Sequence, residues 1–319
     1  MKPSDAARQA LLPLRQASAL PPEVSYVPAG RSSTTYFWVE GTHFDSTFLT
    51  PQDLGKKILQ VTVFQNLCRG LQTESVQLGL GVNASTSETF LQEMFRGVLA
   101  AAKPLRVRAT FGLSVVSPSL FFCSAQSINR AGAKLSRAKP GDWVAVTGTL
   151  GLAAAGNAAL RRFGWPALTD YPEATQAHLR PSPPTAFLLR ARTLLTGVVS
   201  LNDGLASEAH RLAGAAARGI EISQPRLPIA AATRQLAGYM GMNAMQWALY
   251  GAEDYGILFS FAPTNKSKVE ALAKKWRTPL TLVGKLTAGK DIVLEQENGE
   301  ATLLLNRSWN PLVRSKSRA

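Results

Sequence analysis

The sequence predicts a two-domain protein built from both helices and strands. Its 319 residues exceed the size of roughly 250 to 300 residues at which a single core stops growing. Hydrophobic residues make up 45% and charged residues 18% of the chain, a composition too apolar for disorder. Strand patterns with aromatic residues dominate the first part, and helices rich in Gly and Ala dominate after a strand at 143–146. We therefore place a boundary between domains at 1–137 and 138–319.

In the first domain, segments whose apolar residues recur at helical spacing alternate with segments whose apolar and polar residues alternate as in strands. Charged residues interrupt the apolar run at the start, so residues 5–12 predict a short surface helix ended by Pro13 and not a signal peptide. The segment 61–64 suits either a helix or a strand. The elements expected next are a strand at 35–39, a helix at 54–71, a strand at 74–83, a helix at 86–102 capped by Ser85 or Ser87, and a hairpin of strands 107–116 and 119–126.

The second domain alternates strands and helices. A turn at 139–142 leads into the strand at 143–146, and a glycine-rich bend then opens a helix of small residues. A strand at 198–201, a turn at 202–204 and a helix at 205–217 follow later, and a strand at 256–260 comes after a further helix.

Charge and cysteine content limit the classes of partner. The formal net charge is +14, but Lys and Arg are scattered and no nucleic-acid-binding motif accompanies them, so we expect no nucleic acid. The best apolar run is broken by Arg190 and Arg192, so we expect no membrane span. Cys68 and Cys123 are too few for a disulfide framework and predict buried, unreactive thiols. These features indicate a cytoplasmic protein.

Asp203 is the first candidate site residue. It follows a short buried strand and precedes an amphipathic helix. A carboxylate there can cap the helix N-terminus. It can also point into the crevice where sheets of mixed α/β proteins bind ligands, and serve as a metal ligand. Both roles remain open on the residues alone.

The glycine-rich bend VTGTLGLAAAG at 146–156 is the second candidate. A strand, a glycine bend and a helix can present backbone amides to a phosphate. The glycine spacing fits neither a P-loop nor a dinucleotide fingerprint, so close helix packing is the competing interpretation. The three histidines, at 43, 178 and 210, lie on separate segments without metal-ligand spacing, and we expect core or surface roles for them.

Six ordered motifs together resemble one family, the thiamine-monophosphate kinases, within the superfamily of aminoimidazole ribonucleotide synthetase and selenophosphate synthetase. The resemblance runs from about residue 38 to the end. The motifs are WVEGTHF at 38–44, PQDLGKK at 51–57, AKPGDWVAVTGTLG at 138–151, HLRPSPP at 178–184, LNDGLASE at 201–208 and GAEDYGILF at 251–259.

The resemblance implies an α+β fold in two parts. The N-terminal sheet would pair with that of a second subunit into a barrel across a homodimer, and the C-terminal part would hold a mixed sheet with helices. The implied reaction transfers the γ-phosphoryl group of ATP to thiamine monophosphate, with Mg²⁺ held by aspartates. The implied residues are Gly148, Thr149, Gly151 and Asn202 for the nucleotide, Glu253, Asp254 and Trp309 for the substrate, and Asp203 as metal ligand and catalytic residue.

Two of these assignments have a competing interpretation. Glu253 and Asp254 could face a cationic thiazolium or could simply be solvated acids in a helix-to-strand turn. Trp309 lies in RSWNPL at 307–312, which resembles the closing segment of the family, and it would stack on the pyrimidine ring. Pro311 stands where the family has a histidine.

The sequence departs from the family where acids are expected. The paired-aspartate motif is replaced by VPAGRSS at 27–33, and the acids elsewhere align with Tyr36, Gln65, Leu113 and Leu152. Because carboxylates concentrate Mg²⁺ between phosphates, these losses predict impaired kinase activity. Two hypotheses therefore stand: an active kinase with an altered metal site, and a non-catalytic dimeric binding or scaffold protein derived from the family.

Overall fold

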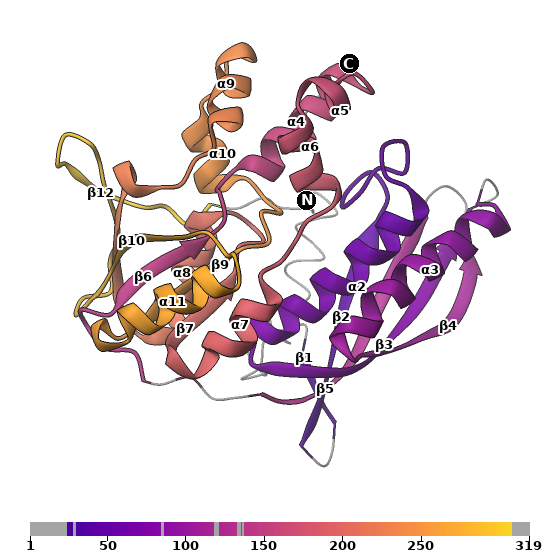
Figure 1. Cartoon of the computed structure of the whole chain (residues 1–319), viewed down its shortest axis with the longest axis horizontal. Helices are drawn as coiled ribbons and strands as arrows, with labels where there is room; N and C mark the ends of the chain where they lie inside the picture. Colours follow the sequence, from indigo (N-terminus) through magenta and orange to yellow (C-terminus); the bar gives the residue numbers. More distant parts are fainter. Residues whose placement is uncertain are drawn as a thin grey trace, which may run out of the picture. The chain divides into compact units, whose positions relative to one another are not determined.

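The computed structural model describes residues 24–27, 30–83, 86–117, 121–132, 135 and 137–307 (Figure 1). The helix expected at 5–12 and Trp309 lie outside these residues. Contacts divide the chain into two units, each described by itself. The first comprises Met1–Thr62, Gln72–Ala131 and Asn310–Ala319, and the second comprises Val63–Leu71 and Gly132–Trp309.

The first unit contains a five-stranded sheet in the order β1-β2-β5-β3-β4. Strand β2 pairs antiparallel with β5 through nine register pairs, and β3 pairs parallel with β4. The predicted strands at 35–39 and 74–83 therefore exist and are longer than expected. The strands are β1 (Val24–Val27), β2 (Arg31–Val39), β3 (Leu71–Val82), β4 (Arg108–Val116) and β5 (Phe122–Ala131).

The predicted hairpin of strands 107–116 and 119–126 is wrong. Both strands form, but β4 lies at the edge beside β3, and β5 lies two positions away between β2 and β3. The Ser117 and Pro118 turn signal indicates only that the chain changes direction. Pairing is decided by the helix between β3 and β4, because a strand, helix and parallel strand form one crossover unit.

In the first unit, α3 (Glu88–Leu105) and the first part of α2 (Pro51–Cys68) approach each other at two glycines. A Cβ atom at Gly55 would overlap the carbonyl oxygen of Met94, and one at Gly97 would overlap that of Gln52. The ambiguous segment 61–64 is helical. Ser87 caps α3, because its Oγ accepts a hydrogen bond of 3.1 Å from the amide of Phe90. Ser87 was one of the two cap residues predicted for this helix.

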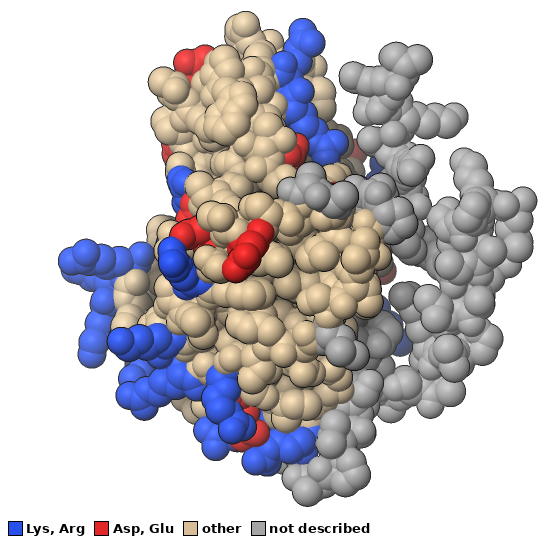
Figure 2. Space-filling model, turned by 90° about the vertical axis from the view of Figure 1, so that its right-hand side faces the viewer, with Lys and Arg blue, Asp and Glu red and all other residues tan. Residues whose placement is uncertain are grey.

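One face of the first sheet carries few buried residues. Along β2, residues 32, 34 and 38 are buried, and Phe37 on the opposite side is 61% exposed. Exposed arginines mark one end of this sheet, where Arg31 is the register partner of Arg130. In the view of Figure 2, Lys and Arg side chains gather at the lower left of one face. The positive charge is thus less evenly spread than its scatter along the sequence suggests.

The second unit contains a seven-stranded mixed sheet in the order β12-β11-β8-β10-β6-β9-β7. Its central strands pair antiparallel, and β11 pairs parallel with β8. The predicted strands at 143–146, 198–201 and 256–260 correspond to β6, which begins at the predicted residue, and to β7 and β9, whose two ends are both shifted. The strands are β6 (Trp143–Thr147), β7 (Leu195–Ser200), β8 (Gly219–Ser223), β9 (Ile257–Phe261), β10 (Leu280–Thr287), β11 (Ile292–Glu295) and β12 (Ala301–Leu303).

Helices accompany this sheet, and apolar clusters form on both of its faces. In strand β9, Leu258 belongs to the cluster on one face and its neighbour Phe259 to the cluster on the other face. Successive side chains of a strand point to opposite faces. The helices are α4 (Leu152–Phe163), α5 (Ala167–Asp170), α6 (Pro172–Leu179), α7 (Thr185–Ala191), α8 (Leu205–Ala216), α9 (Ala231–Tyr239), α10 (Ala244–Tyr250) and α11 (Lys266–Lys275).

Both cysteines are buried, as predicted. Burial raises the pKa of the Cys68 thiol well above its usual value and that of Cys123 to about 12. Thiols that stay protonated are poor nucleophiles. No helix in the described part of the chain is both long and apolar enough to cross a bilayer.

Candidate functional site

Three loops of the second unit meet at one edge of its sheet. Strands β6 and β7 both run antiparallel to β9, so their carboxyl ends lie where β9 begins. The amide of Leu201 donates to the carbonyl oxygen of Gly256 at 2.9 Å, and the amide of Glu253 donates to that of Asn202 at 2.9 Å. The amide of Ile257 donates to Thr147 Oγ1 at 3.0 Å. The segment 251–256 therefore ties the glycine-rich bend to the loop of Asp203.

The backbone of this tying segment adopts an unusual conformation. Glu253 has φ of 71° and Tyr255 has φ of 46°, a left-handed region that costs non-glycine residues roughly 1 kcal/mol or more. Two such residues so close together need strong surrounding contacts to hold them. Backbone strain of this kind clusters at functional sites, which marks the segment for closer inspection.

Asp254 binds the amides of the glycine-rich bend. Its carboxylate accepts hydrogen bonds from the amide of Gly151 at 2.7 Å and from the amide of Ala153 at 3.3 Å. Those amides open α4 and have no partner within the helix. Burial raises the pKa of Asp254 to about 7, although the same hydrogen bonds act to lower it. At the first turn of α4, amides that the sequence predicted could bind a phosphate are thus bound by a carboxylate of the chain itself.

Glu253 forms the second buried contact of the tying segment. Its Oε2 lies 2.9 Å from Nδ1 of His178, and both side chains are largely buried. The hydroxyl of Tyr255 donates to Glu253 Oε1 at 3.2 Å. Glu253 and Asp254 therefore differ from solvated acids in a turn, since both are held by defined partners. His178 comes from α6, and the sequence predicted a core or surface role for it but not this contact with Glu253.

Asp203 does not cap α8, so that alternative is wrong. Gly204 occupies the cap position, and no side chain caps the helix there. The carboxylate of Asp203 instead accepts a hydrogen bond of 2.7 Å from Nη2 of Arg211, and Nη1 of the same guanidinium lies 3.1 Å from Glu208 Oε1. Burial raises the pKa of Glu208 to about 7, and the charge of Arg211 opposes that rise. One arginine thus links two carboxylates.

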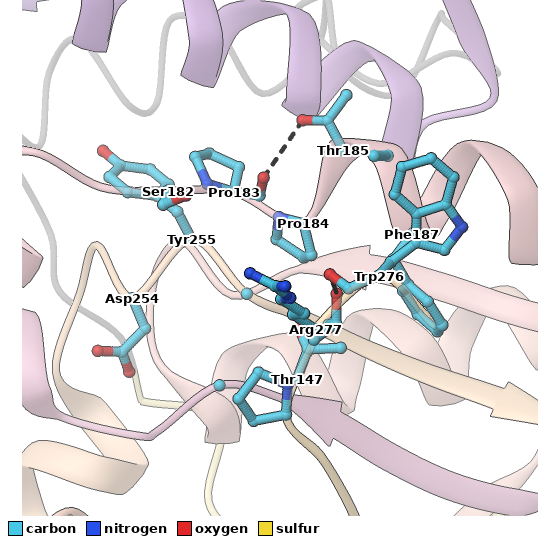
Figure 3. Close-up of a pocket in the computed structure, with 15 residues that line it drawn as sticks. Thr147, Ser182, Pro183, Pro184, Thr185, Phe187, Asp254, Tyr255, Trp276 and Arg277 are labelled. Carbon is cyan, nitrogen blue, oxygen red and sulfur yellow. Dashed lines mark hydrogen bonds between the residues drawn. The ribbon is translucent and has the colours of Figure 1, made fainter. Parts of the chain in front are cut away.

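A cavity of about 250 Å³ opens beside the glycine-rich bend. Figure 3 shows the side chain of Arg277 in the middle of the group that lines it, with the carboxylate of Asp254 pointing away from that centre. Of the predicted site residues, Gly148 and Asp254 belong to this lining, whereas Asp203 does not. Arg277 and Trp276 also line it, from the turn after α11, and sequence reasoning missed both because no local pattern marks that turn.

The carboxylates of the described residues are not gathered into a metal-binding cluster. Among them, no group of three or more His, Cys, Asp or Glu side chains could hold a metal ion. Mg²⁺ requires several oxygen ligands in near-octahedral geometry, and the carboxylate of Asp203 is bonded to a guanidinium. Two of the positions where the family has acids are buried, Gln65 within α2 and Leu152 at the start of α4.

Comparison with known proteins defines the class to which the second unit belongs. Residues 139–297 match the family described as AIR synthase related protein, C-terminal domain. The thiamine-monophosphate kinase of Salmonella typhimurium is 28% identical over 253 residues, which cover 78% of this chain and 77% of that protein. That of Bacillus subtilis is 28% identical over 258 residues and covers 77% of each. The chain is thus similar to thiamine-monophosphate kinases over about three quarters of its length.

Solved structures share the fold over nearly the whole chain. The thiamine monophosphate kinase of Aquifex aeolicus gives a TM-score of 0.77 at 22% identity and covers 95% of this chain and 99% of its own. AaThiL complexed with AMPPCP and TMP gives 0.77 at 21% identity, over 97% of this chain and 98% of its own. The hydrogenase maturation protein HypE of E. coli gives 0.69 at 15% identity, over 96% of this chain and 100% of its own. The mixed α and β architecture agrees with the predicted fold class.

Proposed function

We propose that this protein binds a thiamine phosphate or a nucleotide and that its transfer of the γ-phosphoryl group is impaired. Relatives that align with most of the chain are thiamine-monophosphate kinases, and AaThiL has been solved with AMPPCP and TMP. We assign the ligand to the second unit, where Gly148 and Asp254 belong to the cavity lining. Asn202 and Thr149 lie in the two loops of this sheet edge, and both stay assigned to ligand binding.

The observation that carries the impairment is the ion pair of Asp203. The Nη2–Oδ2 distance to Arg211 is 2.7 Å, so the carboxylate proposed as metal ligand already has a cation. Phosphoryl transfer between two phosphate chains depends on divalent ions that neutralise the developing charge. Tyr36 and Gln65, at two positions where the family has acids, provide neutral side chains. ATP and Mg²⁺ would be the cofactors if the activity survives.

A kinase assay tests the proposal. Purified protein is incubated with ATP, Mg²⁺ and thiamine monophosphate, and thiamine diphosphate is quantified by the fluorescence of its oxidised form. We expect the rate to lie within about twofold of that of the Asp203→Ala variant, because the residue has no metal to position. The Bacillus subtilis kinase serves as the positive control for the assay. A rate about tenfold or more above the variant would establish the active kinase instead.

We further propose a homodimer that buries the open face of the first sheet. Phe37 is 61% exposed on that face, and a large aromatic residue is energetically better placed in an interface. This arrangement would bring two sheets together in the barrel that the family resemblance implies.

Sedimentation velocity tests the dimer. Replacing Phe37 with glutamate should shift the protein from dimer to monomer at micromolar concentration, because the change places a charge in an apolar interface. Leu99 is 54% exposed on α3, and the matched Leu99→Glu variant should keep the wild-type sedimentation coefficient. A monomeric wild-type protein, or equal behaviour of the two variants, would exclude this interface.

A further inference from the structure

Arg211 binds the carboxylate of Asp203, the residue proposed above as metal ligand. Its guanidinium nitrogens lie 2.7 Å from Asp203 Oδ2 and 3.1 Å from Glu208 Oε1. Both distances are those of charge-assisted hydrogen bonds. All three residues come from one stretch, because Asp203 precedes α8 and the other two lie on its first two turns. The helix therefore places the three residues close together, although the side chain of Arg211 itself is 52% exposed.

The burial of the two carboxylates differs, and the arginine lies within hydrogen-bond distance of both. The side chain of Glu208 is 1% exposed and that of Asp203 is 25% exposed. Two acids this close repel each other unless a cation lies between them. Glu208 also accepts a hydrogen bond of 3.3 Å from the amide of Asp203, which fixes the loop to the helix. A permanent guanidinium satisfies this pair without any ion from solution.

We propose that Arg211 is a built-in cation that replaces a divalent metal ion at Asp203, so that ligand binding at this sheet edge requires no divalent ion. A guanidinium carries one fixed charge and directional donors, and it cannot be removed by a chelator. Metal-dependent phosphate sites lose their ligand when the ion is withdrawn. The part of this inference that concerns phosphorylated ligands rests on the function proposed above, and the part that concerns metal ions does not.

Uptake of Mn²⁺ tests the metal part directly. Free Mn²⁺ is followed by electron paramagnetic resonance in the presence of wild type, Asp203→Asn, Arg211→Met and the double variant. We expect wild type and Asp203→Asn to behave alike. We expect Arg211→Met to bind Mn²⁺ at least about tenfold more tightly than wild type, because two carboxylates lose their cation. The double variant should lose that gain.

Two outcomes would overturn the inference. One is Mn²⁺ binding by wild type that Asp203→Asn abolishes, and the other is a folded Arg211→Met protein that binds no better than wild type. If Arg211→Met does not fold, the comparison of wild type with Asp203→Asn still decides the question. Arg211→Lys, which keeps the charge, provides a further folded protein and should bind Mn²⁺ as weakly as wild type.

Calorimetric titration with thiamine monophosphate tests the ligand part. We expect its Kd to agree within about twofold between buffer with Mg²⁺ and buffer with EDTA. A loss of binding in EDTA would overturn the inference and leave the proposed function intact. An absence of binding in both buffers would count against the proposed function, and the Mn²⁺ measurement would then decide the inference by itself.

Discussion

Replacing Asp254 with alanine is expected to lower the free energy of unfolding by about 3 kcal/mol. The change removes the acceptor for the amides of Gly151 and Ala153 at a buried helix end. Buried donors left without a partner cost more than the hydrogen bond itself contributes. Urea unfolding followed by circular dichroism measures the loss. Asp254→Asn keeps one carbonyl oxygen and should lose less.

The pH dependence of this variant pair is a second measure of the same contact. Burial raises the pKa of Asp254 to about 7, so its folded-state pKa lies above the unfolded value. The stability it contributes is present at low pH and is lost as pH rises toward the folded pKa. The difference in unfolding free energy between wild type and Asp254→Asn should therefore shrink as pH rises from about 5 to 7 and level off above the folded-state pKa.

A matched exposed acid provides the control for Asp254. Glu297 lies in the turn between β11 and β12 and is exposed, so Glu297→Ala should change stability by less than about 0.5 kcal/mol. Equal losses for the two alanine variants would show that the amides of α4 do not depend on Asp254. A pH-independent difference between wild type and Asp254→Asn would contradict the raised pKa.

Replacing His178 with alanine is expected to cost about 3 kcal/mol of stability. The imidazole lies 2.9 Å from a carboxylate oxygen of Glu253, and both side chains are largely buried. Removing one partner leaves the other polar group buried with one contact fewer. The loosened segment should also disturb the loop of Asp203, because the amide of Glu253 donates to the carbonyl oxygen of Asn202.

A double-mutant cycle separates this pair from the general cost of removing a buried side chain. The combined variant His178→Ala with Glu253→Ala should lose less than the sum of the single variants by about 1 kcal/mol or more. His210→Ala is the matched control, since it removes a hydrogen bond of 2.7 Å to the carbonyl oxygen of Leu304 but no contact with a carboxylate. Strict additivity would refute the coupling.

Elements with a clear local pattern could be predicted from the sequence. The helix α3 and its Ser87 cap follow from apolar spacing and from one side chain, and β6 follows from the turn that precedes it. The pairing of β4 with β3 could not be predicted, because turn residues describe a change of direction and not the partner strand. Local signals decide the type of an element, and long-range packing decides its neighbours.

In the candidate site, too, local motifs could be recognised in the sequence, whereas long-range contacts could not. Asp203 and the pair Glu253 and Asp254 were found because motifs in the sequence mark them. The residues that contact these acids could not be predicted from the sequence. His178, for example, precedes Glu253 by 75 residues (253 − 178) and belongs to a different element. Arg211 is closer in sequence, but nothing in an amphipathic helix indicates which arginine turns back toward its N-terminus.

The end of α2 has a consequence for how this protein can change over evolution. Val63–Leu71 group with the second unit, and Phe64 and Leu67 pack in one of its apolar clusters. Nη1 of Arg192 donates to the carbonyl oxygen of Leu67 at 2.7 Å. A gene fragment that starts before β6 would thus leave this cluster incomplete. We therefore expect that exchanging the chain after residue 132 for that of another protein would remove part of this core and destabilise the second unit.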